Sequence, residues 1–305
     1  MYTRAFLLLT LAMGVTAAWT EHDAIQTNKK SFEQELKISS IGYKKTMTET
    51  KQKVAQPNPY FIATSIPETT AEIISVVTLE TNNALVQFRE KNRHPIASIT
   101  KFMTAIIAER LIEKNTRIVI EEEDTETEGP AGNFAAGEIF SVDDLIKVML
   151  VVSSNDAATA LARVIGAKKF VDAMQQTARS LGMENTTFFD PTGLSSLNQS
   201  PAEDLAILVN DMSKNHENLL RITRAASATI IEQRSGQFRI LRNINEFAEV
   251  DGFEGGKTGY TDEARGNLIS LFRVGEHKLL IAILGSNDRF GDTRKLYDWA
   301  KTMLQ

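Results

Sequence analysis

Ser98 and Lys101 place a hydroxyl and an amine three residues apart. On a helix, residues with this spacing share one face, with Cβ atoms about 5 to 6 Å apart. Serine is a weak nucleophile until a base removes its proton, and a neutral lysine can be that base if burial or a second cation lowers its pKa. The pair therefore predicts nucleophilic catalysis. The alternative is a helix-cap serine and a surface lysine, because this spacing occurs by chance about once in a chain of this size.

A second candidate is the turn Ser153-Ser154-Asn155, which lies between an apolar run and a helix-like run. A hydroxyl and a carboxamide projected from such a turn can relay a proton and bind a substrate amide. The same residues would also serve as an ordinary helix cap. The spacing recurs at Ser196-Leu197-Asn198, so the pattern carries little information by itself.

The third candidate is Lys257-Thr258-Gly259, preceded by two further glycines. Lysine and threonine offer a cation and a hydroxyl to a carboxylate, and glycine lets a backbone approach a ligand closely. A surface turn is the alternative, but this tripeptide is expected only about 0.1 times per chain. The three motifs in this order together indicate an acyl-transfer site.

Composition narrows the chemistry further. The chain has 305 residues and a net charge of -5, with 42% hydrophobic and 24% charged residues, which is typical of a globular protein and provides no basic surface for nucleic acid. The absence of cysteine excludes thiol nucleophiles, thiolate zinc, iron-sulfur clusters and disulfides. Four scattered histidines disfavour metal catalysis and a histidine-based triad. The sequence therefore predicts neither a cofactor nor a catalytic metal.

The N-terminus is typical of an export signal. Arg4 precedes the uncharged stretch 5–20, and small residues up to Ala18 provide a cleavage site. The uncharged stretch is shorter than the roughly 20 residues of a membrane-spanning helix. We predict a signal peptide over 1–18, with an uncleaved anchor as the alternative, then a polar spacer over 19–65 that lacks apolar residues for a core.

From residue 66 the hydrophobic pattern predicts a folded domain to residue 305. A β-hairpin is expected over 73–79 and 84–88, and a buried helix from Ser98 to Leu111. Helices are expected over 142–151, 155–165, 168–181 and 201–213, with almost no strand between them, followed by a hairpin over 267–272 and 278–284 and a closing helix over 292–304. This order predicts an α/β (α+β) fold whose sheet is completed by both ends of the domain.

The motifs and their surroundings resemble the low-molecular-mass penicillin-binding D-alanyl-D-alanine peptidases of the serine type. The resemblance runs from about residue 66 to the C-terminus. It is carried by the segments 96–105, 137–138, 153–158, 181–183, 191–194 and 256–261. It implies an antiparallel sheet flanked by helices, with an inserted all-helical region and the active site between the two.

The resemblance also implies the role of each catalytic residue. Ser98 would be the acylated nucleophile and Lys101 its base. Ser153 would relay a proton to the leaving group, and Asn155 would bind the substrate backbone. Lys257 would complete the electrostatics and help to keep Lys101 neutral.

Substrate binding is assigned in the same way. Thr258 would bind the terminal carboxylate beside Gly259, and the backbone N–H groups of Ser98 and Tyr260 would form the oxyanion hole. Arg289 stands where the family places an arginine near that carboxylate. Arg294 is a nearby rival for this role.

The predicted function is a serine-type D-alanyl-D-alanine carboxypeptidase or endopeptidase that acts on peptidoglycan peptides outside the cytoplasm and is inhibited by β-lactams. The chain ends just after the closing helix, as do short family members, some of which cut cross-links as endopeptidases. Asn243-Ile244-Asn245 departs from the family's usual Asn-Thr-Asn. Contact with a membrane is expected at most through the N-terminal segment.

Two alternatives remain open from the sequence. A class A-like β-lactamase would need a carboxylate to activate the deacylating water, and Glu203 lies in no obvious equivalent loop. A non-catalytic wall-binding protein would keep the cleft without turnover, which three intact motifs argue against.

Overall fold

The computed structural model describes residues 66–81, 83–129 and 132–304. Residues 62–305 form one compact unit. The predicted signal peptide and spacer, 1–18 and 19–65, lie outside the described residues. None of the helices within the described ranges is long and apolar enough to cross a membrane.

A five-stranded antiparallel sheet forms the larger layer of this unit, in the order β2-β1-β11-β10-β9. Its strands are β1 (Ile73–Thr78), β2 (Asn83–Phe88), β9 (Phe253–Thr261), β10 (Arg265–Val274) and β11 (His277–Ser286). Strand β1 pairs with β11 in the register Ile73 to Leu284. Both predicted hairpins and the closure of the sheet by the two ends of the domain are therefore confirmed.

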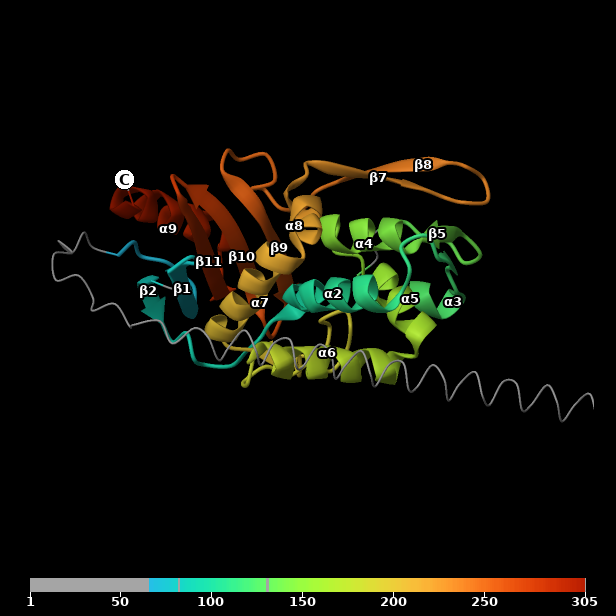
Figure 1. The fold of residues 1–305 in the computed structure, drawn as a ribbon, viewed down its shortest axis with the longest axis horizontal. Helices are drawn as coiled ribbons and strands as arrows, with labels where there is room; N and C mark the ends of the chain where they lie inside the picture. The colour runs from blue at the N-terminus through green and yellow to red at the C-terminus, as the bar shows by residue number, and fades with distance from the viewer. Residues whose placement is uncertain (1–65, 82, 130–131, 305) are drawn as a thin grey trace, which may run out of the picture. The chain divides into compact units, whose positions relative to one another are not determined.

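Helices cover both faces of this sheet (Figure 1). On one face lies α9 (Arg289–Leu304), whose Leu296 and Tyr297 pack in a core with Phe272. On the other lie α7 (Ala202–Asn215) and α8 (Glu217–Arg224). Because both faces are covered, β1 is buried along its whole length, which explains its continuous apolar run.

The helical region carries the second half of the site. It contains α2 (Lys101–Leu111), α3 (Glu122–Thr125), α4 (Val142–Val151), α5 (Asn155–Ile165) and α6 (Ala167–Leu181). Ser141 caps α4 by accepting from the Asp144 N–H, and Ser154 caps α5 by accepting from the Ala157 N–H. The helices predicted over 142–151, 155–165, 168–181 and 201–213 are confirmed.

The expectation of almost no strand between the helices over 142–213 is confirmed, because only a two-residue strand lies there among the described residues. Outside this range the structure contains strands that the sequence analysis did not predict. The chain forms a separate hairpin of β7 (Ser227–Ile231) and β8 (Phe238–Arg242). Short pieces also pair locally: β3 (His94–Pro95) with β6 (Gln199–Ser200), and β4 (Arg117–Val119) with β5 (Ile139–Ser141). Pieces of two or three residues are too short to show a period of two in the sequence.

Candidate active site

Ser98 lies in a short 3-10 helix, η1 (Ala97–Thr100), directly before α2. The preceding residue, Ala97, has a φ of 48°, a left-handed conformation that costs energy for a side chain with a Cβ. Two glycines permit close packing around this turn. A Cβ on Gly193 would lie 2.0 Å from the Ala97 carbonyl oxygen, and one on Gly259 would lie 2.8 Å from the Ile96 carbonyl oxygen.

Lys101 is fully buried one turn after Ser98. Its Nζ lies 2.8 Å from Ser98 Oγ, 2.7 Å from Asn155 Oδ1 and 2.5 Å from the Thr192 carbonyl oxygen. A neutral amine has two N–H donors and one lone pair. Asn155 Oδ1 and the Thr192 carbonyl oxygen can only accept hydrogen bonds, so they take the two N–H groups of the Lys101 amine. The Ser98 hydroxyl can then donate its hydrogen to the lone pair of the amine.

Burial lowers the pKa of Lys101 to about 7, while the negative charge of Asp190 opposes this shift. An ordinary lysine is neutral in only about one molecule in a thousand at neutral pH. With a pKa near 7, about half of the molecules carry the base form there. The lowering was expected from the sequence, but burial is its main cause.

Asp190 is a site residue that the sequence analysis did not identify. Its Oδ1 accepts from Thr192 N, Thr192 Oγ1 and Gly193 N, and its Oδ2 accepts from Ser195 N and Asn198 Nδ2. These bonds hold the loop that presents the Thr192 carbonyl to Lys101. They also lower the pKa of Asp190, because they favour its ionised form, although burial acts in the opposite direction.

The second motif lies at the junction of α4 and α5. Ser153 has a left-handed backbone conformation, with a φ of 63°, and lies in the turn just before α5. Asn155 is the first residue of α5. Asn155 donates through Nδ2 to the Glu128 carbonyl at 2.5 Å and accepts from Lys101. The carboxamide therefore connects the helical region directly to the Lys101 amine.

Lys257 lies on β9, with its side chain almost completely buried. Its Nζ donates to Ser153 Oγ at 2.8 Å and to the Thr258 carbonyl at 2.9 Å. Burial lowers its pKa well below the usual value, and the charges of Lys101 and Arg289 add to this effect. Each of the two amines thus contacts one serine: Lys101 contacts Ser98, and Lys257 contacts Ser153.

The predicted substrate-binding residues follow along the same strand. Thr258 is buried, whereas Tyr260 is 63% exposed. Arg289 Nη1 donates to the Gly259 carbonyl at 3.0 Å, and burial lowers the pKa of this guanidinium. Its rival Arg294 is 53% exposed and points instead to Glu246, 3.9 Å away. The structure therefore brings Arg289, and not Arg294, to the third motif.

The position of β9 explains how these groups face a common space. It is the last strand in the order of the sheet, so one of its edges has no neighbouring strand among the residues that the structure describes. Gly259 brings that strand against η1, close to the Ser98 backbone nitrogen. An extended peptide along this edge would lie between β9 and the turn that carries Ser153.

In the second serine and asparagine pair, Ser196 and Asn198, the asparagine has a structural role. Asn198 is fully buried, accepts from the Phe189 N–H at 2.9 Å and donates to Asp190. It therefore braces the loop behind Lys101. Among the described residues, no group of three histidine, aspartate or glutamate side chains is placed to hold a metal ion.

Comparison with protein families gives a match over residues 61–288 to Peptidase S11, described as D-alanyl-D-alanine carboxypeptidase. A D-alanyl-D-alanine endopeptidase of Haemophilus influenzae is 36% identical over 210 residues, which cover 67% of this chain and 70% of that protein.

Solved structures agree with this match. A putative penicillin-binding protein homologue of Mycobacterium tuberculosis has a TM-score of 0.74 at 27% identity, covering 80% of this chain and 95% of that one. Penicillin-binding protein D2 of Listeria monocytogenes, in its ampicillin-bound form, has a TM-score of 0.68 at 26% identity, covering 80% and 98%. The predicted fold class is confirmed.

Proposed function

Because this chain belongs to the D-alanyl-D-alanine carboxypeptidase family, Peptidase S11, we propose that Ser98 is its nucleophile and Lys101 the base that activates it. The protein is a serine-type D-alanyl-D-alanine peptidase. The observation that carries the assignment of roles is the 2.8 Å contact between Ser98 Oγ and a buried lysine whose pKa is about 7.

In the acylation step Lys101 accepts the Ser98 proton while Oγ attacks the carbonyl carbon of the penultimate D-alanine. Negative charge then develops on the carbonyl oxygen, and the backbone N–H groups of Ser98 and Tyr260 stabilise it. The C–N bond breaks, and the leaving amine takes the proton that Lys101 received from Ser98, relayed through the Ser153 hydroxyl, so that Lys101 is neutral again. Ser153 is oriented by the hydrogen bond that it accepts from Lys257. The product is an acyl ester on Ser98.

Deacylation reverses the proton path. Neutral Lys101 takes a proton from water, the hydroxide attacks the ester carbon, and the Ser98 oxygen leaves with a proton from the same lysine. A β-lactam follows only the first step efficiently, since its leaving amine stays tethered to the acyl group and shields the ester.

The carboxylate on the leaving side of the substrate is assigned to Thr258, Lys257 and Arg289. Arg289 contacts the Gly259 carbonyl and lies close enough to Lys257 to lower its pKa. A bound carboxylate would relieve this repulsion between the two cations, which favours an anionic group at this point.

Within the family we propose a preference for cross-linked peptides over free pentapeptides, on the basis of the 36% identity to a protein named as an endopeptidase. The test compares release of D-alanine from a pentapeptide with cleavage of a cross-linked dimer. Ser98→Ala should abolish both reactions, and Ser196→Ala, in the structural loop, should leave both unchanged. Faster turnover of the pentapeptide would overturn the preference without affecting the assignment of Ser98.

Export to the periplasm or cell wall is part of the same proposal. Peptidoglycan lies outside the cytoplasm, and Arg4 with the uncharged stretch 5–20 is typical of a signal peptide. N-terminal sequencing of the secreted protein tests this: a chain beginning at Trp19 supports cleavage after residue 18, and one beginning at Met1 supports an anchor.

A β-lactamase activity is not favoured by the groups around Lys101. The carboxylate whose charge influences the pKa of Lys101 is that of Asp190. Both of its oxygens already accept hydrogen bonds from residues of the loop 192–198. It is therefore not free to activate a deacylating water.

A further inference from the structure

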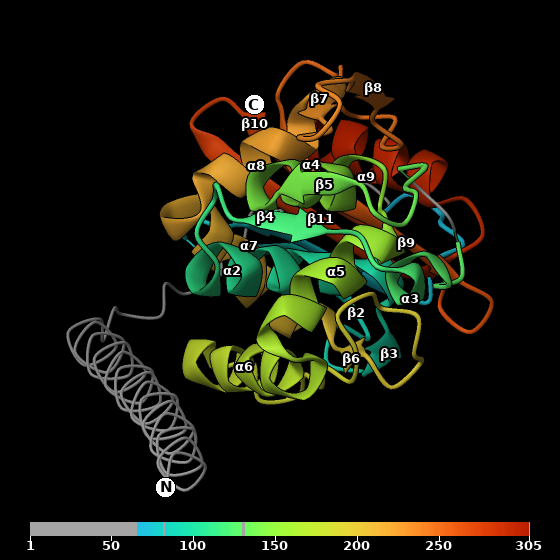
Figure 2. The same cartoon turned by 90° about the vertical axis from the view of Figure 1, so that its right-hand side faces the viewer.

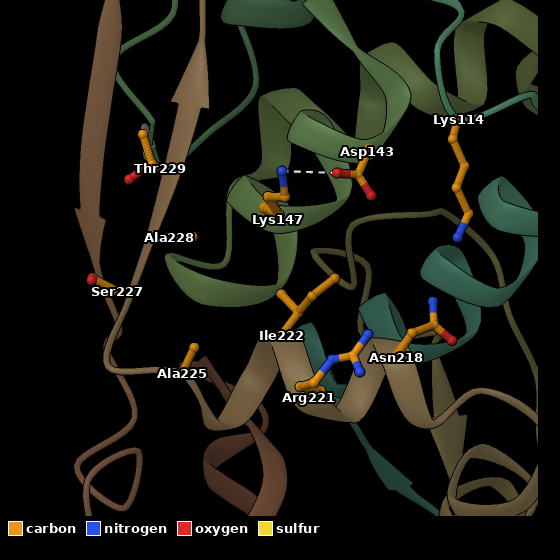
Figure 3. A pocket seen from close by; sticks show the side chains of 10 residues that line it. All are labelled: Lys114, Asp143, Lys147, Asn218, Arg221, Ile222, Ala225, Ser227, Ala228 and Thr229. Carbon is orange, nitrogen blue, oxygen red and sulfur yellow. Dashed lines mark ion pairs between the residues drawn. The ribbon is translucent and has the colours of Figure 1, made fainter.

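A groove of about 390 Å³ lies away from the catalytic residues, between α4, α8 and β7. Figure 3 shows Arg221 and Asn218 rising from α8 towards Lys147 and Asp143 on α4, with β7 at one end and Lys114 at the other. None of the groove's lining residues belongs to the three catalytic motifs. Its volume is that of a small ligand site.

One wall of the groove is an open strand edge. Strand β7 pairs with β8 in the register Ile231 to Phe238, and the bond from Glu232 N to the Gln237 carbonyl marks a hydrogen-bonded pair. Along an antiparallel ladder, hydrogen-bonded pairs alternate with pairs that are not hydrogen-bonded. Ser227 and Thr229 belong to pairs of the second kind, so their N–H and C=O groups point away from β8. Both residues line the groove. At these two residues the edge can therefore accept an added strand, whereas the next outward-directed N–H, that of Ile231, already donates to Asp144 Oδ2 at 3.4 Å.

The cations around this edge are mostly paired within the protein. Lys147 is paired with Asp143 at 2.8 Å and with Asp144 at 2.9 Å, and Lys114 is paired with Glu109 at 3.3 Å. Arg221 is exposed and has no ion pair within the described part of the chain. It is the cation available to a ligand.

The hairpin also exposes apolar side chains next to this edge. Its inner face packs on the protein through Ile230, whereas Ile231, Phe238 and Ile240 on the outer face are 47%, 68% and 65% exposed. The solvent face of a sheet is ordinarily polar, and exposed apolar groups of this size mark contact sites. An added strand would extend this outer face and place its own apolar side chains beside it.

We propose that β7 binds an extended acidic segment of another protein by strand addition, with a carboxylate of that segment paired to Arg221. A second copy of β7 is a poor partner, because the strand carries no acidic residue and would bring the same cations together. A wall peptide is also a poor partner, because its D-residues do not fit a regular strand. The segment would pair with β7 at Ser227 and Thr229, because the Ile231 N–H at the end of the strand already bonds to Asp144.

The test uses a fluorescein-labelled heptapeptide of alternating glutamate and valine, with binding to the full chain followed by fluorescence anisotropy at low salt. Saturable binding is expected, and Arg221→Glu should weaken it at least about tenfold. Arg179→Glu is the matched control, because it makes the same charge change on α6, which Figure 2 shows on the side of the domain away from β7 and β8.

Two further peptides and one further protein sample separate the outcomes. A peptide with lysine in place of glutamate, and a glutamate peptide with N-methyl groups on alternate amides, should each bind at least about tenfold more weakly. Protein acylated with ampicillin should bind as well as free protein, because the groove is separate from Ser98.

Equal binding of the lysine or N-methyl peptide would overturn the proposal, as would equal binding by the Arg221→Glu variant. Displacement of the probe by a soluble wall peptide would assign the groove to the substrate polymer and overturn the protein partner. Acylation of Ser98 by ampicillin, measured on every sample, reports on the proposed function independently.

Discussion

In the mechanism that we propose, Lys101 can accept the Ser98 proton only in its neutral form, so the protonation of this one buried amine would govern the rate of the first chemical step. Burial holds the pKa of Lys101 at about 7, with Asp190 acting to raise it. The second-order rate of acylation by a β-lactam should therefore rise with pH and level off above about 7. Asp190→Asn removes the opposing charge, so the rising limb should move to lower pH.

The control for this prediction is Asp172→Asn, which changes an exposed carboxylate on α6 that pairs with Lys168. That variant should leave the pH dependence of the acylation rate unchanged. Asp190→Asn should also lower the free energy of unfolding by about 1 to 3 kcal/mol, because an amide oxygen cannot accept all the loop N–H groups that the carboxylate accepts. If Asp190→Asn lowers the stability but does not shift the pH dependence of the acylation rate, Asp190 only stabilises the loop.

At the scale of residues the sequence predicted which side chains gather at one site. Lys101 contacts Ser98, as their spacing predicted. The contacts of Lys101 with Asn155 and of Lys257 with Ser153 were not predicted. The Thr192 carbonyl and Asp190 were missed. A backbone carbonyl leaves no signature in residue type, and Asp190 acts through a loop whose bonds appear only once the chain has folded.

Strand β9 shows what the sequence could not predict at the scale of elements. Its three glycines favour a turn, because glycine weakens a strand. The structure makes it a strand of nine residues, in which Gly259 passes the Ile96 carbonyl too closely for a side chain. The packing of β9 against η1 thus outweighs the local preference of the three glycines for a turn.

Gly259→Ala tests this contact. A Cβ there would lie 2.8 Å from the Ile96 oxygen, so β9 must move away from η1. Because small displacements of reacting groups are costly, the acylation rate should fall about tenfold to a hundredfold. Gly275→Ala, in the open turn between β10 and β11, should lower the melting temperature and leave the rate unchanged. Equal rates for both variants would contradict the role of this contact.

A second link between elements is Glu109 at the end of α2. It accepts from Asn218 Nδ2 at 2.5 Å and lies 3.1 Å from His216 Nδ1, and these bonds, together with Lys114, lower its pKa to about 2. A carboxyl group whose pKa is lowered by folding stabilises the protein at pH values above its unfolded-state pKa, which is near 4.5 here. This stabilisation is lost as the pH falls towards 2.

Glu109→Gln should therefore lower the free energy of unfolding by about 2 kcal/mol at pH 7. The difference from the parent should shrink as the pH falls from about 4.5 to about 2, in urea unfolding followed by circular dichroism. Glu113→Gln, an exposed change just after the same helix, is the control. A difference that stays constant with pH would exclude the charge of Glu109 as its source.

For the molecule as a whole, the sheet joins distant parts of the chain. Strand β1 lies between β2 and β11, and α9 covers the same sheet, so the ends of the described domain support each other. The sequence predicted this closure from two apolar hairpins. It missed the β7–β8 hairpin, whose exposed Phe238 and Ile240 break the polar pattern by which an outer strand face is recognised.

The segment 66–305 should fold and react without the residues before it, because the sheet and both of its helical layers lie within it. We expect one cooperative thermal transition and an acylation rate close to that of the longer chain. A broad, non-cooperative transition would show that the preceding residues contribute to the core.

The most direct test of the account is the site of covalent modification by ampicillin, found by mass spectrometry of the intact protein and its peptides. The account predicts one adduct per chain, on the peptide that contains Ser98, and none on Ser98→Ala. An adduct of equal stoichiometry on the Ser98→Ala variant, or one mapped to Ser153, would contradict it.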